Sequence, residues 1–426
     1  MRTAEVPDPG DLLALLPVPD ALSWVRQGDG LVGWGTAAKI TLPAGHDRFA
    51  AGEKWLREVF DAADITDEVN LPGTGPVAFG SFTFDPASDG SVLVVPNIVL
   101  GRGGGRSWLT TIVPAEADGS GRAGMPAPGL PVPGLPEVPS PLPAPARLTT
   151  PSGVRWSDGG LSAPDWERAV AAAVDAIGAG TVRKVVLALD LHATAAQDID
   201  PRVLLTRLAA RYPDCYTFAC AGLVGATPEL LIRRTGGWVH SLVLAGTTPR
   251  GGTAEADDEL GAALLASAKD LDEHQYAVRD VRASLAPLCS SLEVAPRPVL
   301  LRLENVQHLA TRVEGVLADD GSGQRSALAL AAALHPTPAV CGTPSESALE
   351  LIRELEGMDR GRYSGPVGWV DARGNGEWGI ALRCGEISGR QARLFAGCGI
   401  VAGSQPASEL AEAQAKLRPM RQAIEG

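Results

Sequence analysis

The chain has 426 residues, of which 45% are hydrophobic and 20% are charged, and its formal net charge is -13. This composition is typical of a folded protein with a large core and is too apolar for a disordered chain. The acidic balance argues against a nucleic acid or an anionic membrane as partner, because both require basic surface patches. An anionic small molecule held by a few local cations or by a metal ion is still compatible with it.

The N-terminal residues 1–20 carry acids and prolines where a secretory signal needs an apolar stretch. No uncharged run approaches the roughly 18 apolar residues that a membrane-spanning helix needs. Six cysteines show no CxxC spacing and resemble scattered reduced thiols. We therefore expect a cytoplasmic protein with no membrane contact. The length is compatible with two or three domains or with one large α+β domain.

Residues 31–116 alternate short β-like runs with Gly, Asp and Pro turns, and within them only residues 47–63 have the pattern of an amphipathic helix. This part is predicted to be mostly antiparallel sheet. Residues 125–145 contain nine prolines and can join neither a helix nor an inner strand. We therefore divide the chain into 1–124, a proline-rich connector at 125–150, and 151–426.

The second part alternates helical and strand patterns. Ser162 or Asp165 is a candidate N-cap for its first helix. Leu264, Leu271, Val278 and Leu285 recur every seven residues, which predicts one long helix with an apolar stripe. The other predicted elements are a helix over 162–177, a strand over 184–193, a helix near 200–212, and strands over 215–226 and 229–234.

Lys184 opens the predicted strand, and the two-residue period places it on one face with Val186 and Ala188. Lysine is a poor strand residue, so its presence needs a reason. One interpretation is an edge-strand lysine that prevents aggregation. The other is a desolvated lysine whose lowered pKa lets it act as a base.

Glu229 stands directly before an apolar strand and after a run of small residues and a proline. At the mouth of a strand its carboxyl group would be partly dry, and burial raises the pKa of such a group. A protonated Glu can act as a general acid near neutral pH. A solvated glutamate at the end of a turn is the alternative.

Further charged groups lie on the predicted long helix and at the end of a later strand. Glu273 points roughly 160° away from the apolar stripe at the ~100° per residue of a helix, which predicts a solvent face, a surface pair with Lys269 and a surface position for His274. Arg383 ends a predicted strand and is either a surface cation or a bidentate clamp for a carboxylate.

The C-terminal stretch 408–417 places Glu409, Glu412 and Lys416 at i, i+3 and i+7 on one face of a predicted helix. Taken alone, this pattern is typical of a solvated helix face with weak ion pairs. It can equally assemble two carboxylates and an ammonium group for a ligand.

The order and spacing of these stretches closely resemble the chorismate-utilising enzymes, and within them the isochorismate synthases. Before residue 125 the resemblance is only general. It rests on RKVVLA (183–188), GATPELL (225–231), LAGTTPRG (244–251), SAKDLDEH (267–274), VQHLATRVEG (306–315), HPTPAVCG (335–342), YSGPVGWVDARGNGEWGIALRC (363–384), LFAGCGIVAGS (394–404) and ELAEAQAKL (409–417).

Details within these motifs favour isochorismate synthases over their relatives. HPTPAVCG and HLAT resemble that group, and Thr343-Pro344 stands where anthranilate and salicylate synthases have a loop ending in lysine. No Cys-His glutaminase segment is present. Leu189 replaces an arginine that is usual in the family, but alternation places it opposite Lys184, so the base should be retained.

The resemblance implies an α+β fold of two stacked, mainly antiparallel sheets flanked by helices, with the connector crossing the surface of one integrated domain. It also implies a Mg²⁺ cofactor held by Glu273 and Glu412, with Glu409 supporting the water shell of the ion. In this interpretation Lys184 is the general base and Glu229 the general acid. The implied substrate-binding residues are Arg383, Tyr363, Gly397, Gly399 and Lys416, with His308, Thr311, Ala245 and Gly246 as positioning groups on the pocket wall.

The implied reaction is the reversible conversion of chorismate to isochorismate by addition of water at C2 and loss of the C4 hydroxyl. A salicylate synthase, which goes on to eliminate pyruvate, and a non-catalytic chorismate-binding paralogue are the alternatives. We expect a monomer without a glutaminase subunit. Menaquinone formation, siderophore formation and other secondary metabolism all remain open as the pathway.

Overall fold

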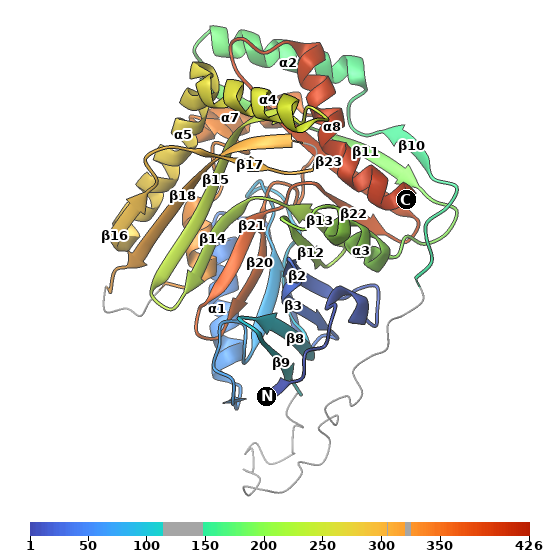
Figure 1. Ribbon diagram of the computed structural model, residues 1–426, viewed down its shortest axis with the longest axis vertical. Coiled ribbons are helices and arrows are strands. Elements are labelled where there is room, and N and C mark those ends of the chain that lie inside the picture. Colours follow the sequence, from blue (N-terminus) through green and yellow to red (C-terminus); the bar gives the residue numbers. More distant parts are fainter. Residues whose placement is uncertain (114–147, 305, 320–324) are drawn as a thin grey trace, which may run out of the picture.

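The computed structural model describes residues 1–113, 148–304, 306–319 and 325–426 (Figure 1). Most of the predicted connector, 125–147, lies outside the described residues. Within the described ranges the helices are α1 (Arg48–Asp61), α2 (Ala163–Gly178), α3 (Pro201–Arg211), α4 (Ala254–Ala266), α5 (Ala268–Leu285), α6 (Ala327–Leu334), α7 (Ser345–Leu355) and α8 (Pro406–Glu425), with the short 3₁₀ segments η1 (Leu13–Leu15) and η2 (Ala286–Leu288).

The described strands form two sheets, one of 13 strands and one of 10. In spatial order the larger sheet contains β10 (Arg155–Asp158), β11 (Lys184–Thr194) with β19 (Gly342–Thr343) beside it, β23 (Gln391–Ile400), β22 (Cys384–Ser388), β13 (Leu223–Thr227), β12 (Tyr216–Cys220), β2 (Leu22–Arg26), β3 (Asp29–Trp34), β8 (Ile98–Gly103), β9 (Arg106–Thr111), β1 (Arg2–Val6) and β5 (Thr66–Asp67). The smaller contains β16 (Cys289–Val294), β18 (Val306–Leu317) with β17 (Val299–Arg302) beside it, β15 (Trp238–Pro249), β14 (Leu230–Thr235), β21 (Gly376–Ile380), β20 (Pro366–Asp371), β6 (Val77–Ser81), β7 (Ser91–Val95) and β4 (Ala38–Leu42).

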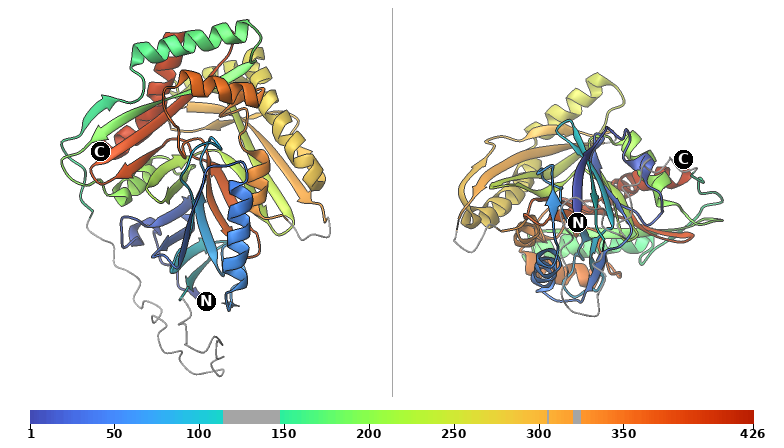
Figure 2. Two further views of the ribbon diagram at one scale, coloured as in Figure 1. Left: turned by 180° about the vertical axis from the view of Figure 1, so that it is seen from behind. Right: turned by 90° about the horizontal axis from the view of Figure 1, so that it is seen from below.

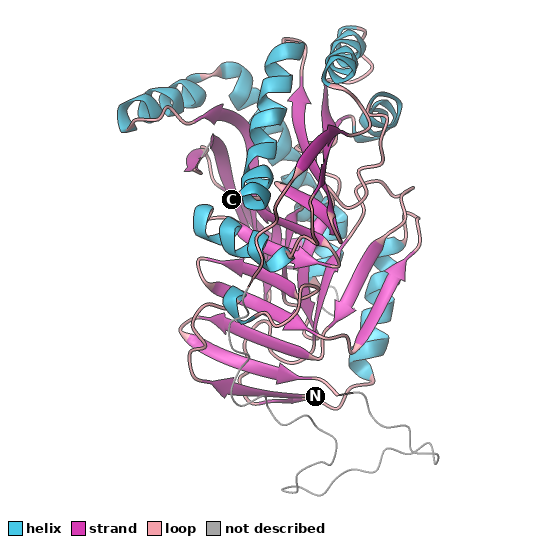
Figure 3. Cartoon of the chain, turned by 90° about the vertical axis from the view of Figure 1, so that its right-hand side faces the viewer, coloured by secondary structure: helices cyan, strands magenta, loops and turns pink. Residues whose placement is uncertain are grey.

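The two sheets are antiparallel throughout, apart from the β1–β5 pair, among the described strands. Helices α2, α3, α7 and α8 pack on the larger sheet, and α1, α4, α5 and α6 pack on the smaller one. Figure 3 shows the sheets in side view with helices on their outer faces. The predicted α+β fold with two stacked, mainly antiparallel sheets is confirmed.

The local signals in the sequence place most elements correctly. Helix α2 begins after Ser162, whose Oγ accepts a hydrogen bond from the Asp165 backbone N–H at 3.4 Å, so Ser162 is the N-cap. Asp200 caps α3 in the same way through the backbone N–H of Arg202. Strand β11 covers the predicted 184–193, and α1 lies within the predicted 47–63.

The prediction of one long helix through Leu264 and Leu285 is wrong. Ser267 adopts extended backbone angles, ends α4 and caps α5 through the Asp270 N–H. Side-chain capping by serine competes with helix continuation, which explains the break. The buried positions of α5 are His274, Ala277, Val281 and Leu285, so its apolar stripe is rotated from the one that the seven-residue repeat predicts.

Both sheets contain strands from each side of the proline-rich segment. β2 pairs with β12 in the larger sheet, and β6 pairs with β20 in the smaller one. Figure 2 shows from behind that α1 and the N-terminal strands lie against the strands of the second part. The division at 125–150 within one integrated domain stays a prediction. None of the helices in the described ranges is long and apolar enough to cross a membrane.

Two side chains, in addition to neighbouring strands, form hydrogen bonds with backbone groups along one edge of β11. The Glu356 carboxylate accepts a hydrogen bond from the Ala188 N–H at 2.7 Å, and the Arg360 guanidinium donates to the Val186 carbonyl at 2.7 Å. Arg360 also donates to the Val340 carbonyl at 2.8 Å and forms a buried ion pair with Glu356 at 2.5 Å. This pair fixes the strand that carries Lys184.

Loss of the buried Glu356–Arg360 pair should destabilise the protein much more than loss of an exposed i,i+4 pair. Arg360→Met leaves the Glu356 carboxylate buried without its counter-ion and should lower the free energy of unfolding by about 3–5 kcal/mol. Lys54→Met removes the exposed i,i+4 pair with Glu58 and should change it by less than about 0.5 kcal/mol. Denaturant titration measures both, and equal effects would contradict this role for Arg360.

Candidate functional site

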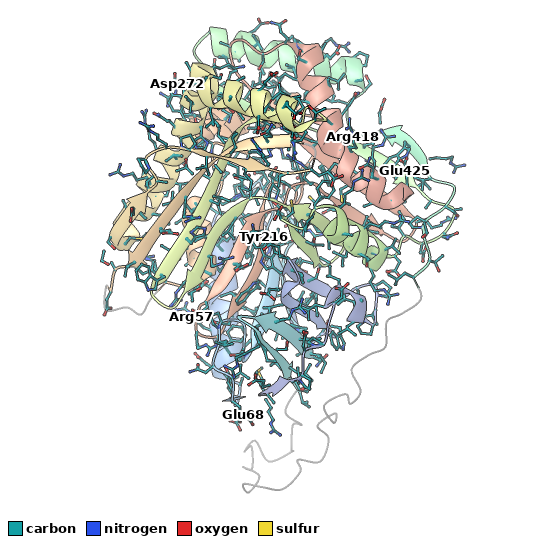
Figure 4. All side chains as sticks on the ribbon, in the orientation of Figure 1. Arg57, Glu68, Tyr216, Asp272, Arg418 and Glu425 are labelled. Carbon is teal, nitrogen blue, oxygen red and sulfur yellow. The ribbon has the colours of Figure 1, made fainter. Side chains whose placement is uncertain are left out.

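A cavity of about 220 Å³ lies where β11, β15 and β23 meet α5 and α8. Figure 4 labels Asp272 and Arg418, which mark α5 and α8 at the end of the molecule away from the N-terminus. Of the residues that the sequence indicates, the cavity lining contains Lys184, Glu229, Ala245, Gly246, Glu273, His308, Tyr363, Arg383, Gly397, Gly399, Glu409, Glu412 and Lys416. The structure therefore brings together residues spread over more than half of the chain.

Lys184 and Glu273 form an ion pair at this cavity, with Nζ 2.7 Å from Oε1. Their side chains are 10% and 18% exposed, so both are largely shielded from solvent. Val186 lines the cavity beside Lys184, as the two-residue alternation predicts. Neither an edge lysine in solvent nor a solvent-facing Glu273 paired with Lys269 describes this arrangement, because Glu273 turns to the lysine of β11.

Leu189 lies on the other face of β11, where it lines a separate cavity together with Leu410 and Leu417 of α8. The replacement of the family arginine therefore affects the packing between β11 and α8. It does not contact the cavity that contains Lys184.

Glu409, Glu412 and Lys416 project from one face of α8, as their spacing predicts. The Lys416 Nζ lies 2.6 Å from Glu412 Oε1 and donates to the Gly397 carbonyl at 3.0 Å. Burial raises the pKa of Glu412, but Lys416, Arg383 and Lys269 together outweigh it and the net pKa is lowered. Burial raises the pKa of Glu409. This stretch is a partly buried charge cluster and not a solvated helix face.

The donor set of this cluster fits a hard divalent cation. Ligand atoms of Cys398, Glu409 and Glu412 lie within 4.8 Å of one another. Burial raises the pKa of the Cys398 thiol, which donates to the Glu409 carbonyl at 3.3 Å, so Cys398 is a poor ligand candidate. Glu273 is not part of this group but lines the same cavity, so the carboxylates of Glu409, Glu412 and Glu273 together offer the hard oxygen donors that Mg²⁺ prefers.

Glu229 is 7% exposed, and its environment suits a general acid. Burial raises its pKa to about 7, although Arg383, Lys184 and Lys416 act in the opposite direction. The backbone of Glu229 is held next to β21, because its carbonyl accepts a hydrogen bond from the Ile380 N–H at 3.2 Å. The carboxyl group can therefore carry a proton near neutral pH, and the solvated-turn interpretation is wrong.

Arg383 follows β21 in the link to β22, with a left-handed backbone φ of 48°. Among the described residues its guanidinium forms no ion pair, although it lines the cavity. A planar guanidinium without an acidic partner is suited to bidentate binding of a ligand carboxylate. Tyr363 lies close by, stacked on Phe395 at 5.1 Å between ring centroids, and burial raises its pKa to about 12.

His308 supplies a further polar group to the cavity. Its Nδ1 lies 2.9 Å from Thr247 Oγ1, whereas its buried Nε2 has no hydrogen-bond partner within the described part of the chain. Burial lowers the pKa of His308 to about 3, so the ring is neutral. An unpartnered buried nitrogen at a cavity wall is suited to a hydrogen bond with a bound ligand.

Thr311 does not line this cavity, in contrast to the sequence-based prediction. It stands three residues after His308 on β18, and an odd separation places two residues on opposite faces of a strand. Its Oγ1 lies 2.6 Å from His274 Nε2, and His274 Nδ1 lies 3.1 Å from the Ala245 carbonyl. His274 is thus buried, not on the surface, and joins α5 to the wall formed by Ala245.

Several cavity residues escaped the sequence analysis as functional candidates. They are Pro228, Leu244, Thr247, Lys269, Asp270, Ala339, Val340, Ser364 and Leu382. Most of them directly neighbour a predicted site residue or lie in a quoted motif. The sequence motifs therefore include most of these residues. The chemistry of each residue type did not show which side chains face the cavity.

Comparisons with known proteins agree with this geometry. Residues 23–425 match the family described as chorismate binding enzyme. The chain is 41% identical to isochorismate synthase DhbC of Bacillus subtilis over 66% of this chain and 77% of that protein. It is 36% identical to isochorismate synthase MenF of the same organism over 88% of this chain and 80% of that protein.

Solved structures match the fold along nearly the whole chain. The menaquinone-specific isochorismate synthase MenF from Escherichia coli superposes with a TM-score of 0.80 at 24% identity, covering 100% of this chain and 94% of that one. Anthranilate synthase component I from Streptococcus pneumoniae superposes with a TM-score of 0.70 at 20% identity, covering 93% and 92%. With the family match over residues 23–425, these findings show that the chain belongs to the chorismate binding enzymes.

Proposed function

We propose that this protein is a Mg²⁺-dependent isochorismate synthase that interconverts chorismate and isochorismate. The observation that carries the proposal is that Lys184, Glu229 and Arg383 line one cavity together with three further carboxylates. Glu229 can be protonated near neutral pH, and Arg383 forms no ion pair among the described residues. The identity to DhbC and MenF, both named isochorismate synthases, supports the same activity.

Glu273 and Glu412 are the residues that would hold the ion, with Glu409 supporting its water shell. When bound, Mg²⁺ would supply positive charge for the ring carboxylate of chorismate. The chain's own cations, Arg383 and Lys416, would bind and orient the remaining anionic groups. This local positive charge accounts for how an acidic protein can accept a dicarboxylate.

Arg383 and Tyr363 are proposed to hold the enolpyruvyl carboxylate. Gly397 and Gly399 leave the β23 wall free of side chains, because a Cβ at Gly399 would lie 2.9 Å from Lys184 Cε and 3.2 Å from Glu273 Oε1. His308 Nε2, Ala245 and Gly246 would then position the ring on the opposite wall. Thr311 would act only through His274.

Lys184 and Glu229 divide the proton transfers. Lys184 Nζ takes a proton from the water whose oxygen forms the new bond to C2. The Glu229 carboxyl group gives its proton to the C4 oxygen as the C4–O bond breaks and the ring double bonds shift. One water enters and one leaves, so the net change is an exchange of hydroxyl positions, and the direction depends on which product is consumed.

We also propose that the protein works in the cytoplasm as a monomer without a glutaminase subunit, since the proposed nucleophile is water and not ammonia. The menaquinone and siderophore pathways both remain compatible, because relatives from both carry similar sequences.

Product identification tests the activity directly. Incubation with chorismate and Mg²⁺ should give isochorismate by chromatography, with and without ammonium. Salicylate and pyruvate would instead indicate a salicylate synthase, an aminated product would indicate an anthranilate-type enzyme, and no turnover would indicate a non-catalytic paralogue.

Removal of either proton-transfer group should reduce turnover strongly without unfolding the protein. Lys184→Ala and Glu229→Gln should each lower kcat by a factor of roughly 10² to 10⁴, the usual contribution of a positioned acid or base. Lys54→Ala, on the exposed face of α1, serves as the control and should leave kcat unchanged. Near wild-type turnover in either site variant would refute its assigned role.

The raised pKa of Glu229 predicts a pH profile. The acid acts only when protonated, so activity should fall as pH rises above about 7, approaching a tenfold loss per pH unit. The residual activity of Glu229→Gln should lack this alkaline decrease, because glutamine does not titrate. If wild type and variant show the same alkaline decrease, another group controls it.

Shared metal binding predicts linked effects of two distant carboxylates. Glu273→Gln and Glu412→Gln should each raise the Mg²⁺ concentration needed for activity and the KM for chorismate together, because both carboxylates would hold the ion whose positive charge would serve the substrate carboxylate. The double variant should lose much less than the product of the single effects. EDTA should abolish wild-type activity, and added Mg²⁺ should restore it.

Glu425→Gln, at the exposed end of α8, is the matched control for these carboxylate substitutions. It should change neither metal dependence nor KM. Activity of Glu273→Gln and Glu412→Gln that matches this control would refute the shared metal site.

A further inference from the structure

Two lysine–glutamate ion pairs lie side by side along the β23 wall of the cavity. Lys184 Nζ contacts Glu273 at 2.7 Å, next to Gly399, and Lys416 Nζ contacts Glu412 at 2.6 Å, next to Gly397. Each lysine therefore occupies a carboxylate oxygen of a proposed metal ligand. In this arrangement the chain supplies its own counter-ions to those carboxylates.

The two pairs differ in what each lysine would retain if its glutamate turned to another cation. Lys416 also donates to the Gly397 carbonyl at 3.0 Å and belongs to the same helix as Glu412. For Lys184, Glu273 is the one side-chain partner within the described residues, and it comes from a different element. Loss of Glu273 would thus leave the Lys184 nitrogen open to the cavity.

Space and charge disfavour the simultaneous binding of Glu273 to the Lys184 ammonium group and to a metal ion. The Lys184–Glu273 pair rests directly on Gly399, where even a Cβ would lie 2.9 Å from Lys184 Cε and 3.2 Å from Glu273 Oε1. An ammonium group and a divalent cation on one shielded carboxylate repel each other strongly, because little water screens them. Binding of a metal ion to this carboxylate therefore favours withdrawal of the ammonium group.

We propose that Lys184 is the resident counter-ion of Glu273 and that Glu273 exchanges Lys184 for the metal ion. This inference rests on the proposed function and deepens it. The exchange would therefore release Lys184 Nζ from Glu273 into the cavity only when the metal ion is bound.

Competition of this kind predicts that loss of the lysine tightens metal binding. Isothermal titration calorimetry with Mg²⁺ alone, without chorismate, measures the dissociation constant independently of activity. Lys184→Met should bind Mg²⁺ about tenfold or more tightly than wild type, within the range usual for coupled sites. Lys184→Gln is the second neutral variant and should shift the affinity in the same direction, with thermal melting to verify that each variant is folded.

Lys269→Met is the matched control. Lys269 lines the same cavity and is exposed, but it forms no ion pair within the described residues. Its loss removes the same charge without releasing a carboxylate, so it reports only the field that Lys269 exerts on Glu409 and Glu412 and should tighten Mg²⁺ binding less than the loss of Lys184 does.

Unchanged or weaker Mg²⁺ binding in Lys184→Met and Lys184→Gln would overturn the exchange. Equal tightening in Lys269→Met would also overturn it, because the effect would then come from the general field of the cavity. Failure of the proposed function would appear elsewhere, as absence of isochorismate from wild-type reactions that contain Mg²⁺ and chorismate.

Discussion

The contact between Lys184 and Glu273 is the interaction on which the arrangement of the site depends. It joins β11, in the larger sheet, to α5, which packs on the smaller sheet. Both side chains are largely shielded from solvent, so each requires the other or a replacement cation. The placement of the two sheets thus determines the distance between the proposed base and a proposed metal ligand.

The strands and helices around this contact hold its residues in place. β11 pairs along its length with β23, which places Val186 opposite Gly399 and Ala188 opposite Gly397. The Glu356–Arg360 pair saturates the opposite edge of β11. α8 then lies against β23 and brings Glu412 and Lys416 to the same glycines. Burial, and not any one charge, raises the pKa of Glu229.

Residue patterns predicted individual helices and strands and much of the site where the signal was local. Alternation placed Lys184 and Val186 on one face, and helix spacing placed Glu409, Glu412 and Lys416 together. The family resemblance supplied the two-sheet fold, which local patterns alone left open. The roles of the site residues and the Mg²⁺ site stay predictions.

The failures came from long-range contacts that no local pattern contains. The leucine repeat alone assigns Glu273 and His274 to solvent, and only the family resemblance places Glu273 in the pocket. Ser267 interrupts the predicted helix, and α5 buries a different face. Thr311 was placed with His308 because the two share a motif, although their odd spacing sends them to opposite faces of β18. The alternation of side chains along a strand predicts that Thr311 and His308 face opposite sides.

The most direct test of this account is a crystal structure with Mn²⁺ in place of Mg²⁺, solved with anomalous diffraction and with chorismate bound. The account predicts an anomalous peak within metal–oxygen bonding distance of both Glu273 and Glu412, with Lys184 Nζ no longer hydrogen-bonded to Glu273 and turned toward the substrate. A peak elsewhere, or an intact Lys184–Glu273 pair beside a bound ion, would contradict it.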